Sequence, residues 1–239
     1  MKKHFLFSVF AAVAICAGCT MTSCSSNDDN EVSTILSNHE LDGTYVEFFE
    51  SESATNSKYD GLWLSEAAKC VGNEKAAEMV QMLKGCMAGN IHGAEAIKLY
   101  GEYENTGKPE TFQFDCHFSN GIKKMVINGS NIKGLDSNGK TVFSHNYKYI
   151  GTDETMGFVK YQTTDGNNDE FKYFFFMPDT PTKTYHTEFR YGSDPSALLE
   201  FYKGNYGYWM CAGVREGNGT ECENAIKLFV SENLSGGEE

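Results

Sequence analysis

The chain has 239 residues, of which 13% are aromatic, and it carries a formal net charge of −13 at pH 7. This length supports one large domain or two small ones with a sizeable hydrophobic core. An acidic protein repels phosphate backbones and anionic lipid headgroups, which argues against nucleic acid as a partner and against electrostatic attachment to a membrane.

Residues 1–23 have the pattern of a secretory signal peptide. Two lysines at the start precede an apolar segment, residues 5–15, that is too short to cross a bilayer as a helix of the mature protein. Small residues precede both Cys19 and Cys24, and either site resembles the cleavage box of a bacterial lipoprotein. We favour Cys24 as the lipidated residue, because the acidic sequence SSNDDNE after it resembles a surface-export signal of some Gram-negative lipoproteins.

The predicted location is therefore the outer membrane of a Gram-negative bacterium. The protein would face the cell surface and be held there only by lipid chains, such as palmitate, on Cys24. A periplasm-facing lipoprotein and a secreted protein without lipid are the alternatives. Residues 24–40 are polar and acidic and are predicted to form a flexible tether.

The cysteines leave the redox state of the protein open. Those that follow Cys24 are Cys70, Cys86, Cys116, Cys211 and Cys222. They include no Cys-x-x-Cys pair, so a thiolate zinc site is not predicted. An envelope location permits disulfides, and either Cys211 with Cys222 or Cys70 with Cys86 could form one. The odd number leaves at least one thiol free, and all of them could be reduced.

The first part of the domain combines predicted strands with two predicted helices. Residues 41–50 and 59–66 both contain Asp-Gly-x-aromatic near their start, which indicates two strand starts. Apolar residues at helical spacing predict a helix over residues 73–88, and a second, shorter one over residues 93–103.

From residue 110 onward the pattern is one of short strands joined by tight turns. Asn138-Gly139 is a strong signal for a hairpin turn. Strands are predicted over residues 111–118, 122–127, 143–149, 158–163 and 170–177. Consecutive strands of this kind form an antiparallel meander. The predicted fold class is mostly β, a lipocalin-like antiparallel barrel with helices inserted after the first strand and at the C-terminus.

Residues 185–209 begin as a strand and continue as a helix. Because strand side chains alternate, His186 and Glu188 share one face, and aromatic residues fill the other. Asp194 is a good N-cap, and Pro195 suits the first helical position. A closing helix is predicted over residues 220–230.

Several segments together resemble the ZinT (YodA) family of bacterial zinc- and cadmium-binding envelope proteins, which have a lipocalin-like (calycin) barrel. They are YDGLWLSE at residues 59–66, NYKYIG at 146–151, GFVKY at 157–161 and the block at 180–209. The order and spacing of these segments carry the resemblance. It implies a single ZinT-type barrel over residues 41–234, followed by a short tail at residues 235–239.

The resemblance also indicates a metal site. The family binds its metal through three histidines, whose counterparts here are Met177, His186 and Glu188. A methionine thioether is a weak ligand for zinc, whereas Asp179 offers a carboxylate close by. His186, Glu188 and Asp179 are therefore the predicted ligands, with zinc or cadmium as the ion. Alternatively, Glu188 pairs with Arg190 on a solvated strand face and no metal binds.

The sequence predicts a binding protein and not an enzyme. It has no Gly-x-Ser-x-Gly, no phosphate-binding glycine loop and no His-Glu-x-x-His. The predicted function is capture or buffering of a divalent metal at the cell envelope. One alternative is a barrel that binds a small apolar or aromatic ligand. Another is a surface interaction module that uses an exposed aromatic patch at residues 205–209. The other histidines, His39, His92, His117 and His145, are interpreted as structural.

Overall fold

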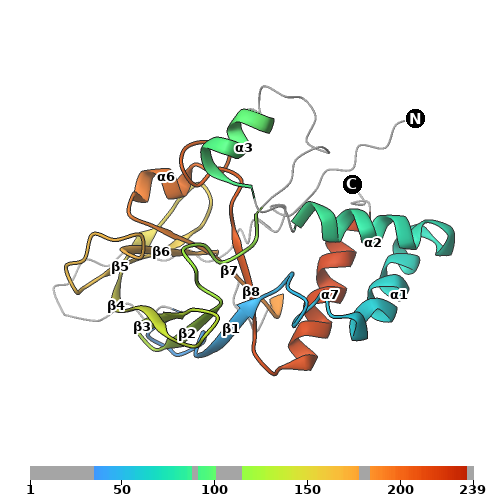
Figure 1. Ribbon diagram of the computed structural model, residues 1–239, viewed down its shortest axis with the longest axis horizontal. Coiled ribbons are helices and arrows are strands. Elements are labelled where there is room, and N and C mark those ends of the chain that lie inside the picture. The colour runs from blue at the N-terminus through green and yellow to red at the C-terminus, as the bar shows by residue number, and fades with distance from the viewer. Residues whose placement is uncertain (1–34, 88–90, 101–114, 178–183, 236–239) are drawn as a thin grey trace, which may run out of the picture.

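The computed structural model describes residues 35–87, 91–100, 115–177 and 184–235. Eight antiparallel strands close into a barrel in the order of the chain. Figure 1 shows how they are arranged in space. The strands are β1 (Gly43–Glu47), β2 (Lys124–Asn128), β3 (Asn131–Leu135), β4 (Thr141–Thr152), β5 (Val159–Thr163), β6 (Tyr173–Phe176), β7 (Thr187–Gly192) and β8 (Cys211–Arg215). The predicted mostly-β antiparallel barrel is confirmed.

The barrel closes where its first and last strands pair. Tyr45 of β1 lies opposite Arg215 of β8, and Glu47 lies opposite Gly213. Closure removes the unpaired strand edges that an open sheet of this size would present. The turn at Asn138-Gly139 joins β3 to β4, as predicted, and Gly139 has a φ of 76°. Strands β3 and β8 were not among the predicted segments.

Helices follow β1, follow β7 and end the chain, again as predicted. They are the short 3₁₀ helix η1 (Ser57–Tyr59), α1 (Asp60–Val71), α2 (Asn73–Met87), α3 (Gly93–Tyr100), α6 (Pro195–Leu199) and α7 (Gly219–Leu234). In Figure 1, α1, α2 and α7 form a helical layer to one side of the barrel. Among the described residues, no helix has the length and apolar character needed to cross a membrane.

The segment at residues 59–66 is not a strand, which corrects the prediction. It lies in η1 and α1, where Trp63 and Ala67, one helical turn apart, are both buried. The indole Nε1 of Trp63 donates a hydrogen bond to the carbonyl of Ala54 at 2.8 Å. The aromatic residue after Asp-Gly therefore anchors a helix to the loop before it.

The start of the described chain is already packed. Leu36 is 2% exposed, and its backbone N–H donates to the hydroxyl of Tyr161 at 3.3 Å. Packed residues therefore precede residue 41, where the predicted domain begins.

Aromatic side chains occupy the barrel interior. Phe174 lies at the centre of this group, with its ring 5.0 Å from that of Tyr191 and 6.0 Å from that of Phe189. Phe176 lies 5.6 Å from Phe189, and all four side chains are almost fully buried. These four packed rings occupy this part of the barrel interior, so this part is not open to an apolar ligand.

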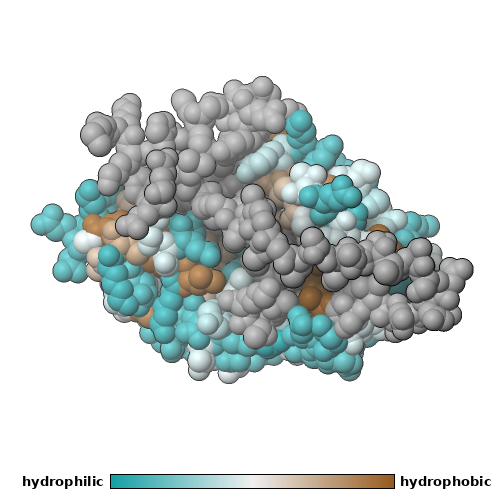
Figure 2. Space-filling model, turned by 180° about the vertical axis from the view of Figure 1, so that it is seen from behind, coloured by the Kyte–Doolittle hydropathy of each residue, from teal (hydrophilic) through white to brown (hydrophobic). Residues whose placement is uncertain are grey.

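The segment from α6 to β8 covers the outer face of β6 and β7. Asp194 caps α6 by accepting hydrogen bonds from the backbone N–H groups of Ser196 and Ala197, as predicted. Tyr208 and Trp209 are at most 1% exposed. The aromatic residues at 205–209 are therefore mostly packed inside the protein, which contradicts the alternative that they form an exposed surface patch. Figure 2 shows a mainly hydrophilic surface where it is not grey, with apolar residues in small separate patches.

The cysteines differ from the predicted pairs. Cys211 and Cys222 are both free and buried, so the predicted disulfide between them is not formed. Cys211 lies in β8, where its Sγ is 3.5 Å from the carbonyl of His117, whereas Cys222 lies in α7. Cys70, a member of the alternative pair, is also free.

Candidate metal centre

The three positions suggested by the family resemblance lie on one face of the β6–β7 ladder. The backbone N–H of Met177 donates to the carbonyl of Glu188 at 2.9 Å, one residue beyond the pair Phe176–Phe189. His186 and Glu188 are two residues apart on the same strand face. Because Phe176 and Phe189 point into the barrel, this face is the outer one.

His186 and Glu188 contact each other, but the described residues bring no third ligand to them. Nε2 of His186 lies 3.3 Å from Oε1 of Glu188, and Nδ1 donates to the carbonyl of Thr184 at 2.8 Å. The ring of His186 also stacks on Phe48, with centroids 6.0 Å apart. The third predicted ligand, Asp179, lies outside the described residues.

The alternative pairing of Glu188 with Arg190 is wrong. Arg190 is fully buried, and its guanidinium donates to the carbonyls of Leu198 and Tyr206. Its ring partner is Phe201, at 5.4 Å from the guanidinium carbon. Burial lowers the pKa of Arg190 to about 9. This side chain holds the α6 segment against the barrel and does not neutralise Glu188.

A second group, Glu47, Glu50 and His117, has the better geometry for a metal ion. One ligand atom from each lies within 4.8 Å of the others, and within the described ranges this is the one such group of three. Nδ1 of His117 is 3.1 Å from Oε2 of Glu47 and 3.3 Å from Oε1 of Glu50. Bonds of about 2.0 Å in a tetrahedral arrangement would separate neighbouring ligand atoms by about 3.3 Å. Two of the three separations are therefore already suited to a small divalent ion.

The fold brings these side chains together from distant segments. Glu47 ends β1, and alternation along that strand places it on the inner face with Tyr45. The segment that carries His117 runs beside β8, held by an isolated parallel bridge between Asp115 and Trp209. The backbone N–H of Phe118 donates to Oε1 of Glu47 at 2.9 Å, which leaves Oε2 facing His117.

Glu50 is positioned by the turn that follows β1. The hydroxyl of Ser53 donates to the carbonyls of Phe48 and Glu50, at 2.8 and 3.1 Å. The backbone N–H of Ser53 donates to the same Glu50 carbonyl at 3.0 Å. This turn reverses the chain so that the carboxylate of Glu50 lies next to that of Glu47.

The carboxylate of Glu47 is held ionised although it is buried. Burial opposes ionisation of Glu47, whose side chain is 1% exposed, but hydrogen bonds and the charge of Lys123 lower its pKa to about 2. The hydrogen bond to Glu47 raises the pKa of His117. Nζ of Lys123 lies 3.2 Å from Oε2 of Glu47 and 3.2 Å from Oε1 of Glu50.

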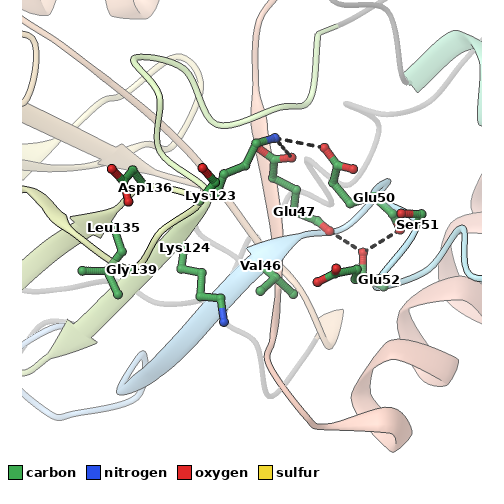
Figure 3. A pocket seen from close by; sticks show the side chains of 12 residues that line it. Val46, Glu47, Glu50, Ser51, Glu52, Lys123, Lys124, Leu135, Asp136 and Gly139 are labelled. Atoms are coloured by element: carbon green, nitrogen blue, oxygen red, sulfur yellow. Dashed lines mark hydrogen bonds and ion pairs between the residues drawn. The ribbon is translucent and has the colours of Figure 1, made fainter.

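An open pocket of about 420 Å³ lies beside this group. Figure 3 shows Lys123 reaching toward Glu47 and Glu50, whereas Lys124 points away from them. The pocket gives solvent and ions access to the partly exposed carboxylate of Glu50 and borders the buried carboxylate of Glu47. It is lined by Val46, Glu47, Glu50, Ser51, Glu52, Ser53, Lys123, Lys124, Leu135, Asp136, Ser137 and Gly139.

Sequence reasoning did not find this group, and it set His117 aside as structural. His117 and Glu47 are 70 positions apart in the chain, so no local spacing links them. The available signal was weak: a glutamate at the end of a strand, a second one three residues on and a histidine in another segment.

Comparison with known protein families and with curated proteins finds no match. Similar solved structures include the following two. The zinc-bound ZinT-like domain of Streptococcus pneumoniae AdcA is 15% identical with a TM-score of 0.47, covering 84% of this chain and 94% of that one. Zinc-bound AdcA from the same organism is 15% identical with a TM-score of 0.45, covering 84% of this chain and 37% of that one. The closed barrel is the fold that the resemblance to the ZinT family implied.

Proposed function

We propose that this barrel binds one divalent metal ion at Glu47, Glu50 and His117. The observation that carries the proposal is the convergence of two carboxylate oxygens and one imidazole nitrogen within 4.8 Å. Zn²⁺ accepts this set of donors, at about 2.0–2.2 Å from oxygen and nitrogen. Three protein ligands leave one tetrahedral position for water, which the adjoining pocket can supply.

The arrangement suits binding and not chemistry. Nδ1 of His117 faces the carboxylates of Glu47 and Glu50, an arrangement that suits the binding of a cation. We therefore propose that the protein captures or buffers a divalent ion, with zinc as the ion to test first. His186 and Glu188, the ligands expected from sequence, supply two donors and are proposed to be an ion pair.

The compartment of this activity is proposed from sequence. A lipid anchor on Cys24 would hold the barrel at the outer membrane, where it meets metal ions before they enter the cell. Mass analysis of the mature N-terminus tests this part separately, since acyl groups on Cys24 support the anchor and their absence rejects it.

Isothermal titration with Zn²⁺ tests the metal site. Demetallated wild-type protein should bind one equivalent, and the double variant Glu47→Gln, Glu50→Gln should bind none. The matched control is Glu52→Gln, because Glu52 lines the same pocket outside the group of three. Circular dichroism should show that the variants remain folded. The proposal is rejected if folded wild-type protein shows no saturable binding, or if the double variant binds as the wild type does.

A further inference from the structure

Lys123 places a cation of the protein itself at the proposed metal site. Its Nζ contacts Oε2 of Glu47 and Oε1 of Glu50, each at 3.2 Å. These are the same two oxygens that face Nδ1 of His117. The ammonium group therefore occupies the oxygens that a metal ion would need.

The side chain of Lys123 is free to leave while its backbone stays in place. Its backbone N–H donates to the carbonyl of Leu135 at 2.7 Å, which fixes this residue just before β2. By contrast, the side chain is 48% exposed and lines the open pocket, as Figure 3 shows. Four rotatable carbon–carbon bonds let the ammonium swing into the pocket without disturbing the strand.

We infer that Lys123 is a tethered competitor that sets the affinity of the site, so that only a divalent ion at sufficient concentration displaces it. This inference rests on the proposed function. A monovalent ion would exchange one unit charge for another and gain little, whereas a divalent ion brings twice the charge to the same two carboxylates. The site would therefore discriminate against monovalent ions and respond to high loads of divalent metal.

Charge repulsion explains why such a competitor would be useful. Without Lys123 or a metal ion, the two carboxylates would share one partly buried position with only the His117 ring beside them, which is unfavourable. Lys123 satisfies both oxygens in the metal-free protein, so the site stays assembled. The same contact lowers the metal affinity, because binding must break two charged hydrogen bonds.

Lys124 provides a matched control. It is the next residue and lines the same pocket, but its Nζ pairs with Glu216 on the other side. Removing either lysine changes the net charge by the same amount. A difference between the two variants therefore reports the position of the charge and not its total.

Titration of Zn²⁺ into demetallated wild-type, Lys123→Met, Lys124→Met and Lys123→Arg proteins tests the inference. Lys123→Met should bind at least about 10-fold more tightly than wild type, because the competing ammonium group is gone. Lys124→Met should stay within about 2-fold of wild type, since its charge is screened and distant. Lys123→Arg should not bind more tightly than wild type, because it keeps a cation at the site.

The outcomes separate this inference from the proposed function. Wild-type binding with no gain in Lys123→Met overturns the inference and leaves the metal site standing. Equal gains in Lys123→Met and Lys124→Met, or in Lys123→Met and Lys123→Arg, also overturn it. Tighter binding by Lys123→Met than by wild type, with no gain in Lys124→Met or Lys123→Arg, supports it. Absence of binding in all four folded proteins rejects the metal site, and the inference with it.

Discussion

The two candidate metal positions lie at the same end of the barrel, on opposite faces of one layer of strands. Glu47 of β1 pairs with Gly213 of β8, and Gly213 pairs in turn with Thr187 of β7. Thr187 is the residue between His186 and Glu188. One position therefore faces inward at β1, and the other faces outward at β7.

The two positions differ in how their donors are supplied. His186 and Glu188 come from one strand, and local alternation guarantees that they meet, at 3.3 Å. A third donor has to come from elsewhere, and the described residues provide none. Glu47, Glu50 and His117 come from a strand, a turn and a distant segment, and all three meet. Spacing along one strand therefore brings two donors together, whereas the tertiary structure brings together three.

The largest expected difference between the two positions comes from removing one histidine from each. His117→Ala should weaken Zn²⁺ binding by at least about 100-fold, because even indirect supports of a metal ligand are worth about 10–100-fold. His186→Ala should change it by less than about 3-fold, because it holds only an ion pair. Titration calorimetry of the two folded variants measures both. If His186→Ala weakens binding more than His117→Ala does, the metal binds at the outer face and not at Glu47, Glu50 and His117.

A double-mutant cycle on the outer face measures whether Glu188 interacts with Arg190. Arg190→Ala should lower the free energy of unfolding by about 2 kcal/mol, because the carbonyls of Leu198 and Tyr206 lose a donor. Glu188→Gln should cost less, since Glu188 pairs with His186. The coupling between the two substitutions should be within about 0.5 kcal/mol of zero in urea denaturation. A larger coupling energy would show that Glu188 and Arg190 form an ion pair in solution, contrary to the structure.

The smallest expected effect is on the titration of His186. Burial lowers the pKa of His186, but the hydrogen bond and charge of Glu188 raise it by more, so the net shift is upward. The charged pair therefore stabilises the fold fully below the unfolded histidine pKa of about 6.5, and this contribution is lost as the pH rises through the folded pKa.

Nuclear magnetic resonance titration of His186 in wild-type protein and in Glu188→Gln measures this shift. The pKa of His186 should fall in the variant. An unchanged pKa would show that Glu188 does not interact with His186 in solution.

Local features of the fold were predictable because neighbouring residues specify them. The alternation of side chains correctly predicted strand β4 and the two faces of β7. Asp194-Pro195 correctly predicted where α6 begins. Helical spacing gave α2 within one residue. By contrast, the aromatic residue after Asp-Gly at Trp63 did not distinguish a strand from a helix, because both can bury one large side chain there.

The sequence by itself determined a mostly-β barrel with its helices after the first strand and at the end. Only the tertiary structure decided that Arg190 is buried against carbonyls and that His117 meets Glu47, 70 positions away. The physical reason is that the helical or strand periodicity of apolar residues depends only on residues close together in the sequence. Contacts between distant segments depend instead on how β1, β7 and β8 pair when the barrel closes.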